Sequence, residues 1–170
     1  MDDRRDIYQW LAHSDLSSSM LGPPDYPDSP VPSWEAFLED YQPYYFDGSR
    51  PDLGRCFVIQ TGGEDVGQIN YNEINAKDRS VELDIWLAAG RYTGKGYGTD
   101  ALAALCDYLH REMGCERFYI APARKNRRAV RCYEKAGFAE TGQIPGWFRP
   151  DYEDTILMEK VMLGKKGGIP

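Results

Sequence analysis

A strand-like stretch followed by a dense run of glycines constrains this chain most. Residues 81–88 read VELDIWLA, and this alternation predicts a strand with one apolar face. Glycine then occurs at positions 94, 96 and 98, where the missing Cβ permits close approach of the backbone to a ligand. Residues 99–113 have apolar side chains at helical spacing before Gly114. A strand, a glycine loop and a helix N-terminus in this order predict an anion site that suits phosphate.

Two common phosphate loops do not fit this stretch. The nucleotide P-loop needs four residues between its first glycine and the Gly-Lys pair, but only three separate Gly90 from Gly94, and Gly96 follows the lysine. The dinucleotide fingerprint needs a third glycine where Thr99 stands, which weakens a dinucleotide oxidoreductase. A tight strand–helix turn without a ligand is the structural alternative.

Two motifs together resemble a known family. The pattern Arg-x-x-Gly-x-Gly at residues 91–96 resembles the pyrophosphate loop of the GNAT superfamily of acyl-CoA N-acyltransferases. Residues 126–138, NRRAVRCYEKAGF, resemble the helix that runs beside the pantetheine arm in that family. With the ending YEDTILMEK, the chain is most similar to the aminoglycoside 6′-N-acetyltransferase branch. The resemblance covers residues 81–138 and 154–160 and is faint before residue 50.

The resemblance implies a single GNAT domain over residues 1–163, followed by a disordered tail at 164–170. The expected fold class is α/β (α+β), with a mixed central sheet of about six to seven strands and about four helices. Its N-terminal strands would be antiparallel, and a splayed parallel pair would admit pantetheine. The family places a strand before the first helix, and residues 1–3 are too short to supply much of one.

Local patterns place the individual elements. Antiparallel strands are expected at 55–60, 66–73 and 81–88 because their connections are short. The helix at 99–113 is long enough for a crossover, so a strand at 115–121 should run parallel to 81–88. Further helices are expected at 6–15, 34–41 and 126–136, and final strands at 138–143 and 155–162.

Composition narrows the partners and the compartment. The formal net charge is −7, which argues against nucleic-acid binding and is compatible with a cationic small-molecule amine. Four cysteines without a C-x-x-C pair, and no signal peptide, predict a cytoplasmic protein with reduced thiols. The chain has only two histidines, so a zinc site would need an unusual set of ligands. The apolar runs are all shorter than a membrane-spanning helix requires. A homodimer is compatible with the family, but the sequence does not decide the oligomeric state.

The resemblance implies acetyl-CoA as co-substrate, without a metal. Backbone N–H groups of the glycine loop would bind the pyrophosphate, and an N–H at Trp86 or Leu87 would polarise the thioester carbonyl. Arg91 and Lys95 would add positive charge or remain solvated. The full set of expected cofactor-binding residues is Trp86, Leu87, Arg91, Tyr92, Thr93, Gly94, Lys95, Gly96, Tyr97, Gly98, Thr99, Asn126 and Tyr133.

Acetyl transfer to an ammonium requires removal of a proton, because only the neutral amine is nucleophilic. Asp84 matches the aspartate that the 6′-N-acetyltransferases place against the acceptor amine, and Glu82 on the same strand face is a second candidate. A surface ion pair is the alternative for both. Tyr133 matches the tyrosine kept near the CoA sulfur, where it would protonate or stabilise the thiolate; a packing role is its alternative. An acyl-Cys132 route is disfavoured because Cys132 points elsewhere on the helix than Tyr133.

The expected acceptor site combines Asp84 and Glu82 with aromatic and loop residues. Trp86 lies on the same strand face, whereas Trp147, Asp154 and Tyr26 come from loops and have plain loop packing as their alternative. The branch resembled implies the 6′-amine of an aminoglycoside as acceptor. A polyamine or a protein N-terminus is the second choice, and a non-catalytic acetyl-CoA-binding module is the alternative outside enzymes.

Overall fold

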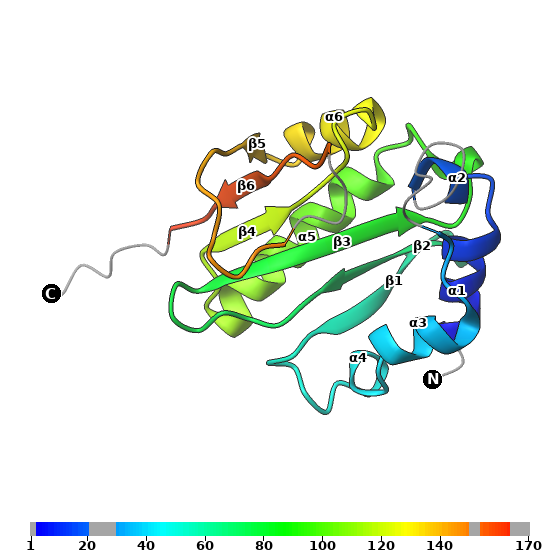
Figure 1. Ribbon diagram of the computed structural model, residues 1–170, viewed down its shortest axis with the longest axis horizontal. Coiled ribbons are helices and arrows are strands. Elements are labelled where there is room, and N and C mark those ends of the chain that lie inside the picture. The colour runs from blue at the N-terminus through cyan, green and yellow to red at the C-terminus, as the bar shows by residue number, and fades with distance from the viewer. Residues whose placement is uncertain (1–2, 21–29, 150–153, 164–170) are drawn as a thin grey trace, which may run out of the picture.

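In the computed structural model, residues 3–20, 30–149 and 154–163 are described, and they form one six-stranded sheet with helices on both faces (Figure 1). The strand order is β1-β2-β3-β4-β6-β5. The strands span β1 Arg55–Thr61, β2 Glu64–Tyr71, β3 Ser80–Leu87, β4 Arg117–Ile120, β5 Ala139–Glu140 and β6 Met158–Val161.

The sheet is mixed, as the sequence predicts. β1, β2 and β3 pair antiparallel through short turns. β3 and β4 pair parallel, because α5 (Tyr97–Met113) connects them as a crossover. β6 then pairs antiparallel with both β4 and β5. The parallel pair therefore lies in the middle of the sheet, between two antiparallel parts.

β3 and β4 separate soon after they meet. Their register covers Ser80↔Arg117 to Glu82↔Tyr119, although β3 continues to Leu87. Val66 accepts a hydrogen bond from Ala88 N at 2.9 Å, which shows that even-numbered β3 residues exchange bonds with β2. Because backbone groups alternate along a strand, the N–H groups of Ile85 and Leu87 are directed toward the β4 side, beyond the end of that pairing.

Each face of the sheet has its own core. Odd-numbered residues of β2 and β3, such as Ile69 and Leu83, pack against α5 and α6 (Arg127–Lys135). The opposite face packs Cys56, Val58 and Trp86 against aromatic residues from three N-terminal helices. These helices are α1 Asp3–His13, α3 Trp34–Asp40 and α4 Tyr44–Asp47.

Some boundaries differ from the sequence predictions. α5 begins at Tyr97, earlier than expected, because Gly96 adopts a left-handed conformation and becomes the N-cap. β5 is only two residues long, and β6 begins at Met158 because Thr155 forms only an isolated bridge with Ala123. The short elements α2 (Ser17–Met20), α4 and η1 (Gly90–Tyr92) have no clear periodic signal.

Within the described ranges no strand precedes α1, and β1 lies at one edge of the sheet (Figure 1). The predicted acceptor contact Tyr26 and the tail 164–170 lie outside the described residues. Among the residues that are described, no helix has the length and apolar character that crossing a membrane requires.

Gly67 tests the tight contact between β2 and β3. A Cβ atom at this position would lie 2.5 Å from the carbonyl oxygen of Trp86 and 2.9 Å from the Cα atom of Leu87. We expect Gly67→Ala to lower the free energy of unfolding by about 1–3 kcal/mol, because the two backbones must move apart. Urea denaturation measures this loss. Gly142→Ala is the control, since no atom lies within 4 Å of its Cβ position; equal stabilities of the two variants would contradict the close approach.

Candidate functional site

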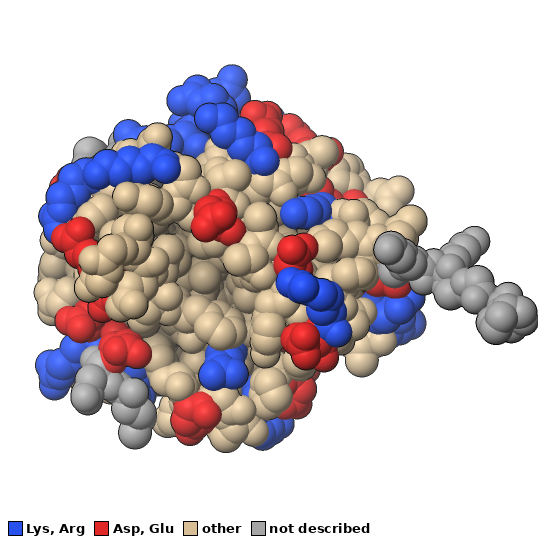
Figure 2. Space-filling model, turned by 180° about the vertical axis from the view of Figure 1, so that it is seen from behind, with Lys and Arg blue, Asp and Glu red and all other residues tan. Residues whose placement is uncertain are grey.

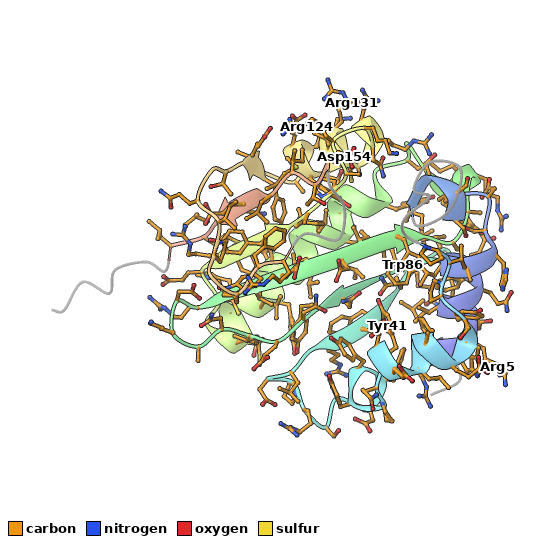
Figure 3. The ribbon with its side chains drawn as sticks, in the orientation of Figure 1. Arg5, Tyr41, Trp86, Arg124, Arg131 and Asp154 are labelled. Carbon is orange, nitrogen blue, oxygen red and sulfur yellow. The ribbon has the colours of Figure 1, made fainter. Side chains whose placement is uncertain are left out.

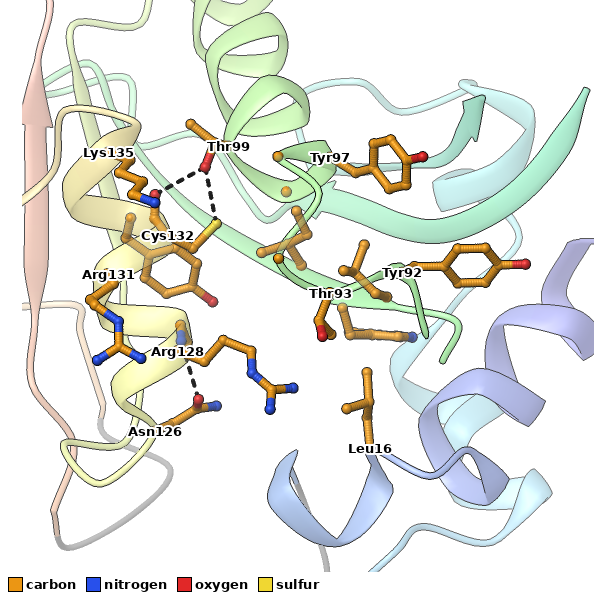
Figure 4. A pocket seen from close by; sticks show the side chains of 18 residues that line it. Leu16, Tyr92, Thr93, Tyr97, Thr99, Asn126, Arg128, Arg131, Cys132 and Lys135 are labelled. Carbon is orange, nitrogen blue, oxygen red and sulfur yellow. Dashed lines mark hydrogen bonds between the residues drawn. The ribbon is translucent and has the colours of Figure 1, made fainter. Parts of the chain in front are cut away.

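A cavity of about 440 Å³ opens where β3 and β4 separate (Figure 4). One wall is the end of β3 with the loop that follows it, and the facing wall is α6. Leu16, between α1 and α2, lies on the far side of the opening (Figure 4). The cavity thus lies between the segments that carry the sequence motifs, which are the end of β3, the glycine loop and α6.

The glycine loop presents an uncapped helix N-terminus to this cavity. Gly94 and Gly96 have φ values of +74° and +91°, which side chains other than glycine rarely adopt. The N-cap of the 17-residue helix α5 is Gly96, and within the described ranges no side-chain hydrogen bond is found at this cap. In contrast, Ser33 caps α3 and Asn126 caps α6 through side-chain oxygens. Uncapped N–H groups at the positive end of a long helix are suited to binding a phosphate.

The α6 wall adds positive charge and two reactive side chains. Arg128, Arg131 and Lys135 line the cavity, and Figure 4 shows Arg128 extending from α6 toward the side where Leu16 lies. Seen from behind, basic side chains gather along the edge that carries α6 (Figure 2). Tyr133 and Cys132 also line the cavity, so α6 brings a phenol and a thiol to its wall.

Most of the expected cofactor-binding residues line this cavity, on one wall or the other. The predicted residues found there are Trp86, Leu87, Tyr92, Thr93, Gly94, Gly96, Tyr97, Gly98, Thr99, Asn126 and Tyr133. Asn126 uses its side-chain oxygen to accept a hydrogen bond from Ala129 N at 3.2 Å. Its amide nitrogen is not used by this cap.

Two predicted residues of the loop are not on the cavity wall. The Arg91 guanidinium lies 4.5 Å from the centre of the Tyr92 ring and donates to the Tyr92 hydroxyl at 2.8 Å. The Lys95 ammonium lies 5.9 Å from the same ring centre. Tyr92 in turn donates to Glu64 at 2.7 Å. The Tyr92 ring therefore holds both cations beside β2. The positive charge that lines the cavity comes from α6 instead.

The backbone also separates Trp86 from Leu87. The N–H of Trp86 is directed toward Gln68 on β2, because residue 86 belongs to the hydrogen-bonded set of that pair. Leu87 has its N–H on the open side. Of the two residues expected to donate to a thioester oxygen, only Leu87 therefore has its N–H free of β2. Ile85, two residues earlier on β3, has its N–H on the same open side.

Asp84 is the end point of a polar network on the opposite face from α5. Its Oδ2 accepts hydrogen bonds from the side-chain amides of Asn70 at 3.2 Å and Asn72 at 3.0 Å. Tyr41 donates to the Asn70 oxygen at 3.4 Å, and Tyr45 donates to the Asn72 oxygen at 3.1 Å. Asn70 and Asn72 thus hold the carboxylate, and the hydroxyls of Tyr41 and Tyr45 hold the two amides.

The electrostatics of this network follow from burial and from the carboxylate. Burial, and then the negative charge of Asp84, raise the pKa of Tyr41 well above its usual value. Burial, Tyr44 and Asp84 raise the pKa of Tyr45. Burial raises the pKa of the Cys56 thiol to about 12, with smaller contributions from Asp3 and Asp84. All three groups therefore keep their protons at neutral pH and can donate to acceptors such as an amide oxygen.

The remaining acceptor residues are spread around this face. Glu82 is one pair before Asp84, beside Tyr119 of β4, and the Trp147 ring meets Tyr119 edge-on with centroids 5.7 Å apart. Trp86 follows Asp84 and meets the ring of Tyr41 at 6.0 Å (Figure 3). Of these residues, Trp86 lines the cavity, whereas Glu82 lies where β3 and β4 still pair.

Asp154 is placed differently from the acceptor residues. Its carbonyl accepts from Arg124 N at 2.8 Å and its carboxylate from Lys125 N at 3.4 Å. Figure 3 shows it next to Arg124, near α6. This aspartate fixes the segment that leads into α6, which is a structural role that the sequence interpretation had kept as its alternative.

The sequence interpretation missed the amides of β2 and the basic residues of α6. Gln68, Asn70 and Asn72 stand at alternating positions, which puts them on one strand face. That alternation is a readable signal, but it does not reveal which residue of β3 they face. Arg128, Arg131 and Lys135 follow a helical spacing of three and four, which places them on neighbouring turns of one helix.

No group of three or more His, Cys, Asp or Glu side chains within the described ranges could hold a metal ion. The described lining of the cavity offers backbone N–H groups, cationic side chains, a phenol and a thiol.

Cysteine labelling tests the openness of the cavity. Burial raises the pKa of Cys56 and Cys106 to about 12 and that of Cys115 to about 11, whereas the half-buried Cys132 lies on the cavity wall. We expect iodoacetamide at about pH 8 to alkylate Cys132 at least about tenfold faster than the others, because the thiolate is the reacting form. Peptide mass spectrometry measures the four rates. A closed cavity would instead leave Cys132 as slow as Cys56.

Known proteins share both the sequence pattern and the fold. Residues 1–139 match the family model described as acetyltransferase (GNAT) domain. The aminoglycoside N(6′)-acetyltransferase type 1 of Klebsiella pneumoniae is 39% identical over 148 residues, which cover 81% of this chain and 70% of that protein. The spermidine N(1)-acetyltransferase of Escherichia coli K12 is 31% identical over 130 residues, covering 74% of this chain and 67% of that protein.

Solved structures agree with this assignment at the level of the fold. A structure of AAC(6′)-Ib with paromomycin and acetyl-CoA superposes with a TM-score of 0.71 at 22% identity, covering 94% of this chain and 88% of that one. The spermidine N-acetyltransferase of Vibrio cholerae, solved with CoA and spermine, gives a TM-score of 0.68 at 24% identity over 94% of this chain and 90% of that one. The chain belongs to the GNAT family of acetyltransferases.

Proposed function

We propose that this protein transfers an acetyl group from acetyl-CoA directly to a primary amine. One observation carries the proposal: an uncapped, glycine-rich helix N-terminus opens into a cavity that lies where β3 separates from β4 and is lined by Ile85 and Trp86, the two residues that follow Asp84 on β3. The related structures hold acetyl-CoA or CoA. In this chain the pyrophosphate would bind the N–H groups of residues 94–99, with Arg128 and Arg131 adding charge from α6.

The chemistry divides among three groups. The N–H of Leu87 would donate to the thioester oxygen and stabilise the negative charge that develops there as the amine nitrogen attacks the carbonyl carbon. Asp84 would take one proton from the ammonium, directly or through water, so that the nitrogen lone pair becomes available. The C–S bond then breaks, and Tyr133 would donate a proton to the leaving thiolate. The nitrogen would lose its second proton at this stage, and that proton would restore the Tyr133 phenol, directly or through water. The nitrogen ends with one acetyl group and CoA leaves as the thiol.

We propose the 6′-amine of an aminoglycoside as the acceptor, and a polyamine amine as the second candidate. The Klebsiella aminoglycoside enzyme has the higher identity over more of the chain, which favours the first. The spermidine enzyme of Escherichia coli matches with 31% identity, which supports the polyamine as the second candidate. Both acceptors are polycations, so a carboxylate on β3 suits either of them.

Two substitutions test the roles of Asp84 and Tyr133. We expect Asp84→Asn and Tyr133→Phe each to lower kcat by about 10²–10⁴-fold, because each removes one proton-transfer group. Acetyl-CoA affinity, measured by calorimetry, should change by less than about twofold, since the loop and α6 cations that bind it remain. Turnover near that of the wild type in both variants would show that these roles are wrong.

An acceptor panel tests the substrate class. Purified protein with acetyl-CoA and a thiol reporter should release CoA with an aminoglycoside bearing a 6′-amine and not with its 6′-hydroxyl counterpart, because only the amine accepts the acetyl group. Spermidine is measured in parallel. Faster turnover of spermidine than of any aminoglycoside would make the polyamine the acceptor.

A further inference from the structure

Three amides at alternating positions, two on β2 and one directly after it, require an explanation. Gln68, Asn70 and Asn72 face the same side of the sheet as Asp84, and Gln68 and Asn70 are almost completely buried, at 0% and 1% exposed. Apolar side chains usually occupy such positions, since a buried amide costs free energy unless every polar atom finds a partner. The cost is met here by a continuous set of hydrogen bonds, and that set has a direction.

Every donor in the set points along the chain of bonds toward Asp84. Cys56 Sγ donates to Gln68 at 3.0 Å, and the Gln68 amide donates to Asn70 Oδ1 at 3.1 Å. Asn70 then donates to Asp84 at 3.2 Å and to Asn72 Oδ1 at 3.1 Å. Asn72 donates to Asp84 at 3.0 Å. Asp84 accepts the bonds from Asn70 and Asn72 on the same oxygen, Oδ2.

The groups on both sides of the amides favour one orientation of each amide. Asn70 Oδ1 accepts from the Tyr41 hydroxyl as well as from Gln68, and Asn72 Oδ1 accepts from the Tyr45 hydroxyl as well as from Asn70. A rotated amide would turn its oxygen toward the Asp84 carboxylate, which can only accept, and would lose that hydrogen bond. A rotated Asn70 would also turn its nitrogen toward the Gln68 amide nitrogen, which can only donate. Burial and Asp84 raise the pKa of both tyrosines, so their hydroxyls remain donors over the working pH range.

We propose that Asn70 and Asn72 are positioning residues that hold the Asp84 carboxylate in one orientation toward the acceptor amine, with the Tyr41 and Tyr45 hydroxyls bonded to the amide oxygens and supporting each amide. This inference rests on the proposed role of Asp84 as proton acceptor. Two amide donors on one carboxylate oxygen restrict its rotation about the Cα–Cβ and Cβ–Cγ bonds. A carboxylate that is already oriented avoids the entropic cost of reaching the geometry for proton transfer.

The test compares neighbouring variants on β2. Asn72→Leu keeps the size of the side chain and removes one donor to Asp84. Tyr71→Phe is the matched control, because Tyr71 lies on the opposite face and its hydroxyl donates only to Pro51 O at 2.9 Å among the described bonds. We expect Asn72→Leu to lower kcat/KM for the acceptor by about 10- to 100-fold, with acetyl-CoA KM almost unchanged. Tyr71→Phe should change kcat/KM by less than about twofold. Similar activities of the two variants would overturn the inference.

A double-mutant cycle separates positioning from general support of the fold, and uses a milder variant in case Asn72→Leu does not fold. Tyr45→Phe removes one hydroxyl behind Asn72 and should lower kcat/KM by a factor of a few in the wild type, but by less than about twofold in the Asp84→Asn background. Equal effects in both backgrounds would contradict a role that acts through Asp84. If Asp84→Asn alone leaves kcat unchanged, the proposed catalytic role fails instead. If Asp84→Asn is inactive while Asn72→Leu is not, only the positioning role fails.

Discussion

The early end of the β3–β4 pairing is the feature on which the rest of the site depends. A parallel pair that continued to Leu87 would satisfy the N–H groups of Ile85 and Leu87 within the sheet and would fill the space between the strands. Because the pairing covers only three residue pairs, those groups face an opening instead. The antiparallel partners on either side, β2 and β6, keep both strands in place while they diverge.

The surrounding elements turn this opening into a site with three different environments. The uncapped start of α5 provides N–H groups and the positive end of a helix dipole. α6 brings cations, a phenol and a thiol to the opposite wall. On the other face of β3, a buried polar network ends on Asp84. β3 therefore links the N-terminus of α5, which is suited to an anion, to the Asp84 carboxylate, which is suited to a cation.

Much of this arrangement could be predicted from the sequence, because it depends on local patterns. The alternation in residues 81–88, the glycines at 94 and 96, and the Asn-to-Phe stretch at 126–138 each specify a local structure without tertiary information. The mixed sheet and the parallel pair followed from connection lengths, and the structure confirms them.

The remainder depended on contacts between distant segments. Arg91 and Lys95 lie on Tyr92 and not on the cavity wall, because Tyr92 is fixed by Glu64 from another hairpin. Asp154 serves the segment before α6, which spacing alone cannot show. The pairing of Asn70 and Asn72 with Asp84 depends on the register of β2 against β3, and a shift by one residue would turn the amides to the other face.

The central claim is that acetyl-CoA lies along the opening between β3 and β4, with its phosphates on the start of α5. Titration of the ¹⁵N-labelled protein with acetyl-CoA, followed by amide chemical shifts, tests this most directly. If acetyl-CoA binds in this position, the largest chemical-shift changes should fall on the amides of Leu87, of residues 94–99 and of the first turn of α6. Saturating acetyl-CoA that leaves the amides of Leu87 and Gly96 unmoved, while others shift, would contradict it.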